Sequence, residues 1–167
     1  MFGILSGRLL TRSVLLSIIV QPVSIFAQRP PSKTEIYDDD FVHTAYLELQ
    51  PFLTKYHPAL LNKQRRVNEH DLKQIDYILT YALGQDRFIF YKTPAKSFII
   101  SFTATSGKLK LAKGVCVGMR KQDFEKAFKQ KVAGDTATVA ETEQFELYTF
   151  TFSQDRLTRI AYRCRID

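Results

Sequence analysis

The chain has 167 residues, 45% of them hydrophobic, and carries a formal net charge of +7. A positive charge of this size favours solubility and encounter with acidic partners, but it does not specify a fold or an activity. The two cysteines, Cys116 and Cys164, are too few for a structural zinc site made of thiolates, which needs four ligands.

The first 27 residues have the pattern of an export signal. Arg8 and Arg12 precede a short apolar run at residues 13–20, and Ile25 and Ala27 fit the −3 and −1 positions of a cleavage site. An uncleaved membrane anchor is the less favoured alternative, because a span needs about 20 apolar residues. We therefore expect cleavage near Ala27 and a periplasmic or secreted protein.

The 140 residues that follow the signal suit one domain with a real core. They carry 22 basic and 17 acidic side chains, a net charge of +5, which allows contact with a membrane surface without insertion. Residues 28–36 are polar and contain prolines, so they predict a flexible lead-in to a domain at residues 37–167. In an oxidising compartment Cys116 and Cys164 could form a disulfide, and two buried free thiols are the alternative.

Residues 37–84 predict two helices with a loop between them. The acidic cluster at residues 38–40 precedes an apolar run with helical spacing, as expected at a helix N-terminus. A second helix is predicted from Asn68, because Leu72, Ile75 and Leu79 fall on one face and Gly84 suits a C-terminal cap. The basic stretch at residues 56–67 predicts a loop.

From residue 87 the pattern is that of strands. Residues 88–91 and 97–103 are rich in aromatic and β-branched side chains and predict a hairpin. A helix follows from about Lys121, and three more strands are expected at residues 136–142, 146–152 and 157–165. The predicted fold class is α+β: a single domain with a mostly antiparallel sheet backed by two or three helices.

The last hairpin allows a prediction of register. Two sets of side chains alternate along its strands: Tyr148, Phe150 and Phe152 on the first, and Ile160, Tyr162, Cys164 and Ile166 on the second. A three-residue loop at residues 154–156 would pair Phe150 with Ile160 and place both sets on one face. The opposite face would carry Phe145, Leu147, Arg159, Arg163 and Arg165.

Three segments of the C-terminal third, residues 114–119, 123–128 and 147–166, carry a recurring pattern of Gly-Met, polar cap, helix and antiparallel strands. This pattern resembles the β-lactamase-inhibitor-protein-like superfamily, which includes the small outer-membrane assembly lipoproteins. Similar exported bacterial proteins also end in an aromatic hairpin. The resemblance implies a protein-binding module rather than an enzyme.

The three histidines, His43, His57 and His70, lie in separate segments without the spacing of metal ligands. Fingerprints of hydrolases, P-loops and dinucleotide sites are missing, so we expect no cofactor, no metal and no catalytic residues. A nucleic-acid platform is disfavoured, because the arginines and the aromatic side chains would face opposite ways.

The sequence favours a non-catalytic module that binds an unknown envelope or extracellular protein. The predicted contact residues are Phe145, Leu147, Arg159, Arg163 and Arg165, a mixture enriched at interfaces. One alternative is a hydrolase-like enzyme that uses His43 and Asp39. Another is a structural component of the envelope.

Overall fold

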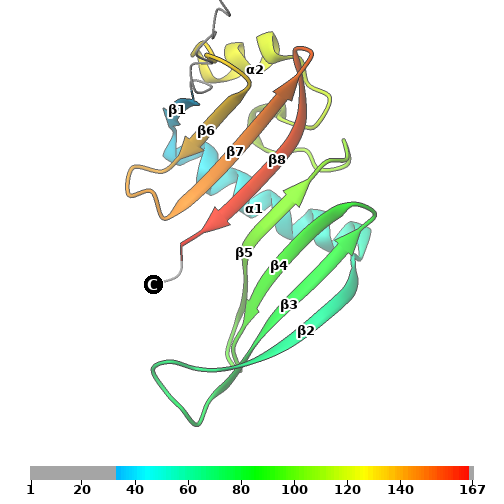
Figure 1. Cartoon of the computed structure of the whole chain (residues 1–167), viewed down its shortest axis with the longest axis vertical. Helices are drawn as coiled ribbons and strands as arrows, with labels where there is room; N and C mark the ends of the chain where they lie inside the picture. The colour runs from blue at the N-terminus through cyan, green and yellow to red at the C-terminus, as the bar shows by residue number, and fades with distance from the viewer. Residues whose placement is uncertain (1–32, 166–167) are drawn as a thin grey trace, which may run out of the picture.

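The computed structural model describes residues 33–165 (Figure 1). The predicted signal at residues 1–27 therefore lies outside the described residues. The elements in chain order are β1 (Lys33–Tyr37), α1 (Asp39–Tyr56), β2 (Ala59–Val67), β3 (Ile75–Leu83), β4 (Asp86–Lys92), β5 (Ser97–Ala104), a short 3-10 turn η1 (Ala112–Gly114), α2 (Lys121–Phe128), β6 (Thr136–Ala140), β7 (Glu146–Ser153) and β8 (Arg156–Cys164).

All eight strands form one sheet in the order β1-β6-β7-β8-β5-β4-β3-β2. Every neighbouring pair is antiparallel except β1 and β6, which run parallel. Strands take 47% and helices 22% of the described residues, so the content lies between α+β and mostly β. A mostly antiparallel sheet with helices is thus present, as the sequence predicted.

Helix α1 begins where the acidic cluster predicts it. The Asp38 carboxylate accepts the Phe41 N–H at 2.9 Å, and the two aspartates of the first turn favour the positive end of the helix dipole. The helix ends at His57, which has a left-handed φ of 45° and donates its N–H to the Leu53 carbonyl. One face of α1 is buried against the sheet.

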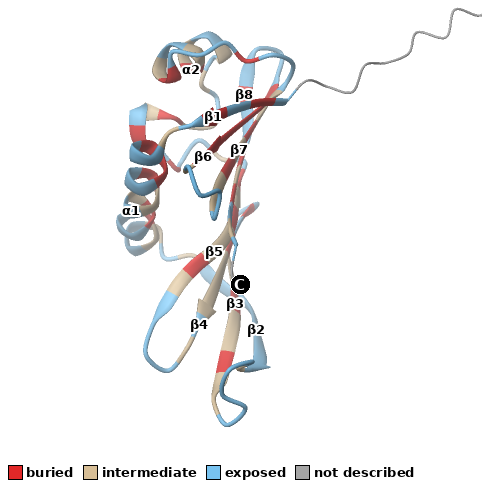
Figure 2. Cartoon of the chain, turned by 90° about the vertical axis from the view of Figure 1, so that its left-hand side faces the viewer, coloured by how far each residue is buried: buried red, intermediate tan, exposed pale blue. Residues whose placement is uncertain are grey.

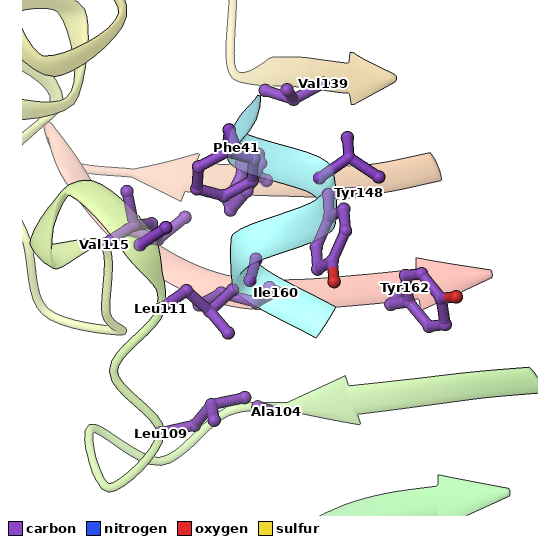
Figure 3. Close-up of a cluster of buried hydrophobic side chains, with 14 of the residues drawn as sticks. Phe41, Ala104, Leu109, Leu111, Val115, Val139, Tyr148, Ile160 and Tyr162 are labelled. Carbon is purple, nitrogen blue, oxygen red and sulfur yellow. The ribbon is translucent and has the colours of Figure 1, made fainter. Parts of the chain in front are cut away.

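The core between α1, α2 and the sheet is rich in aromatic rings (Figure 3). The ring centroid of Phe41 in α1 lies 5.5 Å from that of Tyr148 in β7, and the ring centroid of Phe124 in α2 lies 4.9 Å from that of Phe150. Both helices therefore pack on the same face of the sheet. Burial of each large side chain contributes about 1.5–3 kcal/mol relative to exposure, so this face holds most of the hydrophobic stabilisation.

The register of the last hairpin is confirmed, because Phe150 pairs with Ile160. The predicted three-residue loop is wrong. Only Gln154 and Asp155 form the loop, and a bulge after Thr151 supplies the odd residue that keeps the described members of the two apolar sets on one face. Ile166, the last member of the second set, lies outside the described residues. Both loop residues have positive φ, 49° and 58°, as in a type I′ turn.

Two predictions in the N-terminal half are wrong. The predicted second helix is strand β3, and the predicted loop at residues 56–67 contains strand β2. Leu79 does face inward, but Tyr77, Thr80 and Tyr81 favour a strand over a helix. Gly84 opens a two-residue hairpin turn with a φ of 62° instead of capping a helix. Strands β2 to β4 extend past the end of α1 as an arm (Figure 2).

The predicted flexible lead-in at residues 28–36 is wrong for the residues that the structure describes. Residues 33–36 belong to β1, which pairs with β6 over its full length, whereas residues 28–32 lie outside the described part. Ile36 is 5% exposed and joins the core. A pattern of only five residues had too little length to predict this strand, and its partner lies about a hundred residues further along the chain.

Candidate functional site

One face of the sheet packs against the helices, and the opposite face, here called the open face, is lined by small side chains. Across β6, β7 and β8 the floor of this face consists of Thr138, Thr149 and Ala161, which lie side by side in register. Alternation along the strands places these residues opposite the buried aromatic rings. Because these side chains are small, the sheet surface is recessed here relative to the larger side chains that surround it.

A groove of about 390 Å³ lies on the open face. We call it the open-face groove. It is formed by β1, β6, β7, β8 and the loop between β6 and β7, and its lining residues are Lys33, Glu35, Ile36, Tyr37, Thr138, Ala140, Gln144, Phe145, Leu147, Arg163 and Arg165. Leu147 is central, because it pairs with Ala140 on one side and Arg163 on the other.

Four of the five predicted contact residues meet around this groove. Phe145 is 42% exposed, Leu147 is half-buried on the floor, and Arg163 and Arg165 are exposed at the rim. The Arg165 N–H donates to the Phe145 carbonyl at 2.7 Å, which fixes the two rim residues next to each other. Arg159 lies outside the groove, in a shallower hollow that shares Leu147 and Arg163.

The charges that line the open-face groove are mainly positive. The lining contains three basic residues, Lys33, Arg163 and Arg165, and one acidic residue, Glu35. The Glu35 carboxylate lies 3.8 Å from the Lys33 ammonium. The hydroxyl of Thr138, 2% exposed, has no hydrogen-bond partner among residues 33–165. The groove therefore suits a ligand that carries negative charge and some apolar surface.

Tyr37 is the main groove-lining residue that the sequence did not indicate. It is 55% exposed, and its hydroxyl accepts a hydrogen bond from the Gln144 side chain at 2.8 Å, so it flanks the groove opposite Arg163. The sequence does not indicate this residue, because the acidic cluster that follows it predicts the start of a helix here. Alternation of Thr34 and Ile36 as inward residues is the only local signal of the strand.

A second polar cluster lies on the helix-facing side, where the start of β7 meets the end of β8. The Tyr162 hydroxyl donates to the Glu146 carboxylate at 2.9 Å. Burial raises the pKa of Glu146, and burial together with the Glu146 charge raises the pKa of Tyr162 and of the Cys164 thiol. Glu146 is half-buried, and neither hollow of the open face reaches it.

The predicted disulfide is not formed, and both cysteines are free. The Gly118 N–H bonds the Leu157 carbonyl at 2.7 Å, so Cys116 lies near the start of β8, whereas Cys164 ends that strand. Seven residues of strand span about 23 Å, and a disulfide needs Cα atoms within about 7 Å. Free thiols, the alternative, therefore describe this fold, but both are half-buried rather than buried. Cys164 lies on the core side, as predicted.

The histidines are far apart. His43 and His57 are separated along α1 by about 21 Å, and His70 lies in the loop between β2 and β3. Asp39, the proposed partner of His43, instead accepts the Thr142 N–H at 2.8 Å. In the part of the chain that the structure describes, no three His, Cys, Asp or Glu side chains are grouped to hold a metal ion.

Within residues 33–165, neither helix has the length and apolar character to cross a membrane. Comparisons with protein-family models, curated proteins and solved structures found no match for the chain.

Proposed function

We propose that this protein is an exported, non-catalytic module that binds another protein of the bacterial envelope or the extracellular space through the open-face groove. The observation that carries the proposal is the convergence of Phe145, Leu147, Arg163 and Arg165 from separate positions onto one exposed hollow. Arginine and aromatic side chains dominate the binding energy of protein interfaces, and a central apolar residue with a charged rim is their usual arrangement.

The character of the groove supports a protein ligand over a small molecule. Its volume is at the low end for small-molecule sites, and its floor of threonine and alanine offers few directional groups. Its positive charge favours a partner segment with carboxylates around an apolar side chain. The sequence of residues 114–166 resembles protein-binding modules of the β-lactamase-inhibitor-protein-like superfamily, and this resemblance supports the proposal. Export and cleavage near Ala27 are part of the proposal.

The alternative of a hydrolase that uses His43 and Asp39 has less support. The Asp39 carboxylate is engaged by Thr142, and the other histidines lie far from His43. The other alternative is a structural component without a discrete ligand. In that case, substitutions in the groove would leave contacts with the envelope unchanged, whereas our proposal predicts that they remove one partner.

The test is site-specific photocrosslinking in cells that produce the protein at native levels. A photoreactive residue in place of Leu147 should give one discrete crosslinked protein, whereas the same residue in place of Leu47, which is 55% exposed on α1, should not. Alanine at Phe145, Leu147, Arg163 and Arg165 together, the groove variant, should remove capture of that protein.

A matched control carries alanine at two exposed leucines and two exposed lysines away from the groove: Leu47, Leu72, Lys108 and Lys126. Both quadruple variants should retain the circular dichroism spectrum of the parent protein. Equal capture by the groove variant and the control variant would overturn the proposal.

A further inference from the structure

Strand β2 is a long, exposed edge of the sheet. It has nine residues, all exposed, and its only neighbour among the described strands is β3 (Figure 1). It lies at the opposite end of the strand order from β1, so it is separate from the open-face groove. An edge strand presents backbone N–H and C=O groups that can pair with another extended chain.

The hydrogen bonds of the arm show which backbone groups point outward. The Asn68 N–H donates to the Gln74 carbonyl at 3.0 Å, which places this pair in the bonded class of an antiparallel ladder. The classes alternate along the strand, so Gln64 and Arg66 also bond toward β3. The backbone groups of Lys63, Arg65 and Val67 therefore point away from the sheet.

A buried carboxylate holds the arm in this extended form. Asp76 of β3 is 0% exposed and accepts hydrogen bonds from the Tyr91 hydroxyl at 2.5 Å, the Asn68 amide at 2.6 Å and the Gln74 amide at 2.9 Å. These bonds tie β4, β3 and the loop after β2 together. The edge is thus ordered before any partner arrives, which lowers the entropic cost of binding.

The charge on β2 has one sign. Lys63, Arg65 and Arg66 lie on the strand, which contains no acidic residue, and only Arg66 forms an ion pair within it or its loop, with Glu69. Pairing of two copies through this edge would bring like charges together, which is destabilising. Exposed Leu60 and Leu61, at 51% and 57%, add apolar surface at the start of the strand.

We propose that β2 binds an extended acidic segment of a partner protein, which adds to the sheet as a further strand. Backbone bonds to Lys63, Arg65 and Val67 would supply affinity, as in other complexes formed by strand addition. Carboxylates at alternate positions of the segment would face the Lys63 and Arg65 side chains, because side chains alternate between the faces of a strand.

The probe is a synthetic peptide of nine residues, the length of β2, with glutamate alternating with threonine. Binding is measured by fluorescence anisotropy at low ionic strength, with a lysine–threonine peptide as the charge-reversed control. Arg65→Ala removes a charge, and Arg65→Pro removes the same charge together with the outward N–H, while both leave the bonds to β3 in place. We expect proline to weaken binding about tenfold more than alanine, the equivalent of one lost hydrogen bond.

Amide hydrogen exchange gives the second readout. The peptide should slow exchange at Lys63, Arg65 and Val67 and leave the already bonded Gln64 and Arg66 nearly unchanged. If Arg65→Pro opens the arm, seen as fast exchange at Gln64, the Lys63→Ala and Lys63→Pro pair replaces it. Equal effects of alanine and proline, without new protection of the outward amides, would overturn strand addition in favour of simple charge attraction.

Single-stranded oligothymidylate is the competing probe. Tighter binding of this probe than of the peptide, lost equally in the alanine and proline variants, would assign β2 to nucleic acid and overturn the proposal. Because the open-face groove is also positively charged, a variant with alanine at Leu147 and Arg163 is the control for binding of the peptide there, and it should bind the peptide as the parent protein does. Failure here would therefore be distinct from failure of the proposed groove function.

Discussion

Tyr162 and Glu146 form a hydrogen bond of 2.9 Å between neighbouring strands β8 and β7, on the side of the sheet that faces α1. Tyr162 is 1% exposed, so Glu146 lies at the edge of the core with a buried partner. Burial raises the pKa of Glu146 above its ordinary value of 4.5, and the Tyr162 hydrogen bond offsets this only in part. The ionised carboxylate is therefore less stable in the folded than in the unfolded chain.

This relationship predicts a loss of stability as the pH rises. A raised pKa in the folded state means that the native protein binds more protons than the unfolded chain. The stability that Glu146 contributes through this difference is therefore complete below pH 4.5 and declines as the pH rises above it. Glu146→Gln keeps an acceptor for Tyr162 and removes the charge. We expect this variant to have a higher Tm than the parent protein at neutral pH and an equal Tm in acid, measured by thermal unfolding across this range.

The control is Glu143→Gln, at an exposed position of the preceding loop. It should change the Tm little at any pH. A Tm for Glu146→Gln below that of the parent protein at neutral pH would show that the charge stabilises the fold and contradict the prediction.

Asp86 predicts a large effect on stability. It is 0% exposed and accepts the backbone N–H groups of Thr105 and Ser106 at 2.7 Å and 3.0 Å, together with the Ser106 hydroxyl. Asp86→Ala would remove the acceptor of all these donors at a part-buried site and leave a cavity where the buried carboxylate was. We expect a loss of about 2–4 kcal/mol in the free energy of unfolding, measured by urea denaturation, and a smaller loss for Asp86→Asn.

Asp71→Ala is the matched control, because Asp71 also accepts a backbone N–H, that of Lys73, but is exposed. Water replaces the acceptor there, so the cost should stay below about 1 kcal/mol. Similar losses at the two positions would contradict the role given to burial.

The sequence predicted the parts of the fold that depend on local pattern. The Asp38 cap, the hairpin of β4 and β5, helix α2 and the register of β7 and β8 all follow from residues close together in the chain. The arm could not be predicted in this way. In β3, Ile75 and Leu79 are four residues apart, a spacing that fits one face of a helix and one face of a strand equally well.

The candidate site was predicted only in part for a related reason. Phe145, Leu147 and Arg163 share a face through the hairpin register, which is a local property. Tyr37 and Lys33 reach the same groove through the parallel pairing of β1 with β6. Such long-range pairing depends on the packing of the whole sheet, and neither strand of five residues specifies its partner.

The β7–β8 turn predicts a stabilising double substitution. Gln154 and Asp155 have positive φ values, which are favourable for Asn and Gly in a type I′ turn and costly for glutamine. Gln154→Asn with Asp155→Gly should raise the free energy of unfolding by about 1 kcal/mol. Urea denaturation tests this, and Gln85→Gly serves as control, because Gln85 lies in the other two-residue turn without a positive φ. A gain from Gln85→Gly as large as that of the double variant would contradict the backbone argument.

The two thiols predict a simple chemical result. Because Cys116 and Cys164 lie toward opposite ends of β8, the folded protein purified without reductant should take up two equivalents of iodoacetamide. Burial raises the pKa of the Cys164 thiol, so less of it is thiolate near neutral pH and alkylation of Cys164 should be slow and should accelerate as the pH rises. Peptide mass spectrometry over time separates the two rates. A native protein that takes up no reagent and weighs two hydrogens less than the reduced form would show that the cysteines are bridged after all, and that the ends of β8 are not where the structure places them.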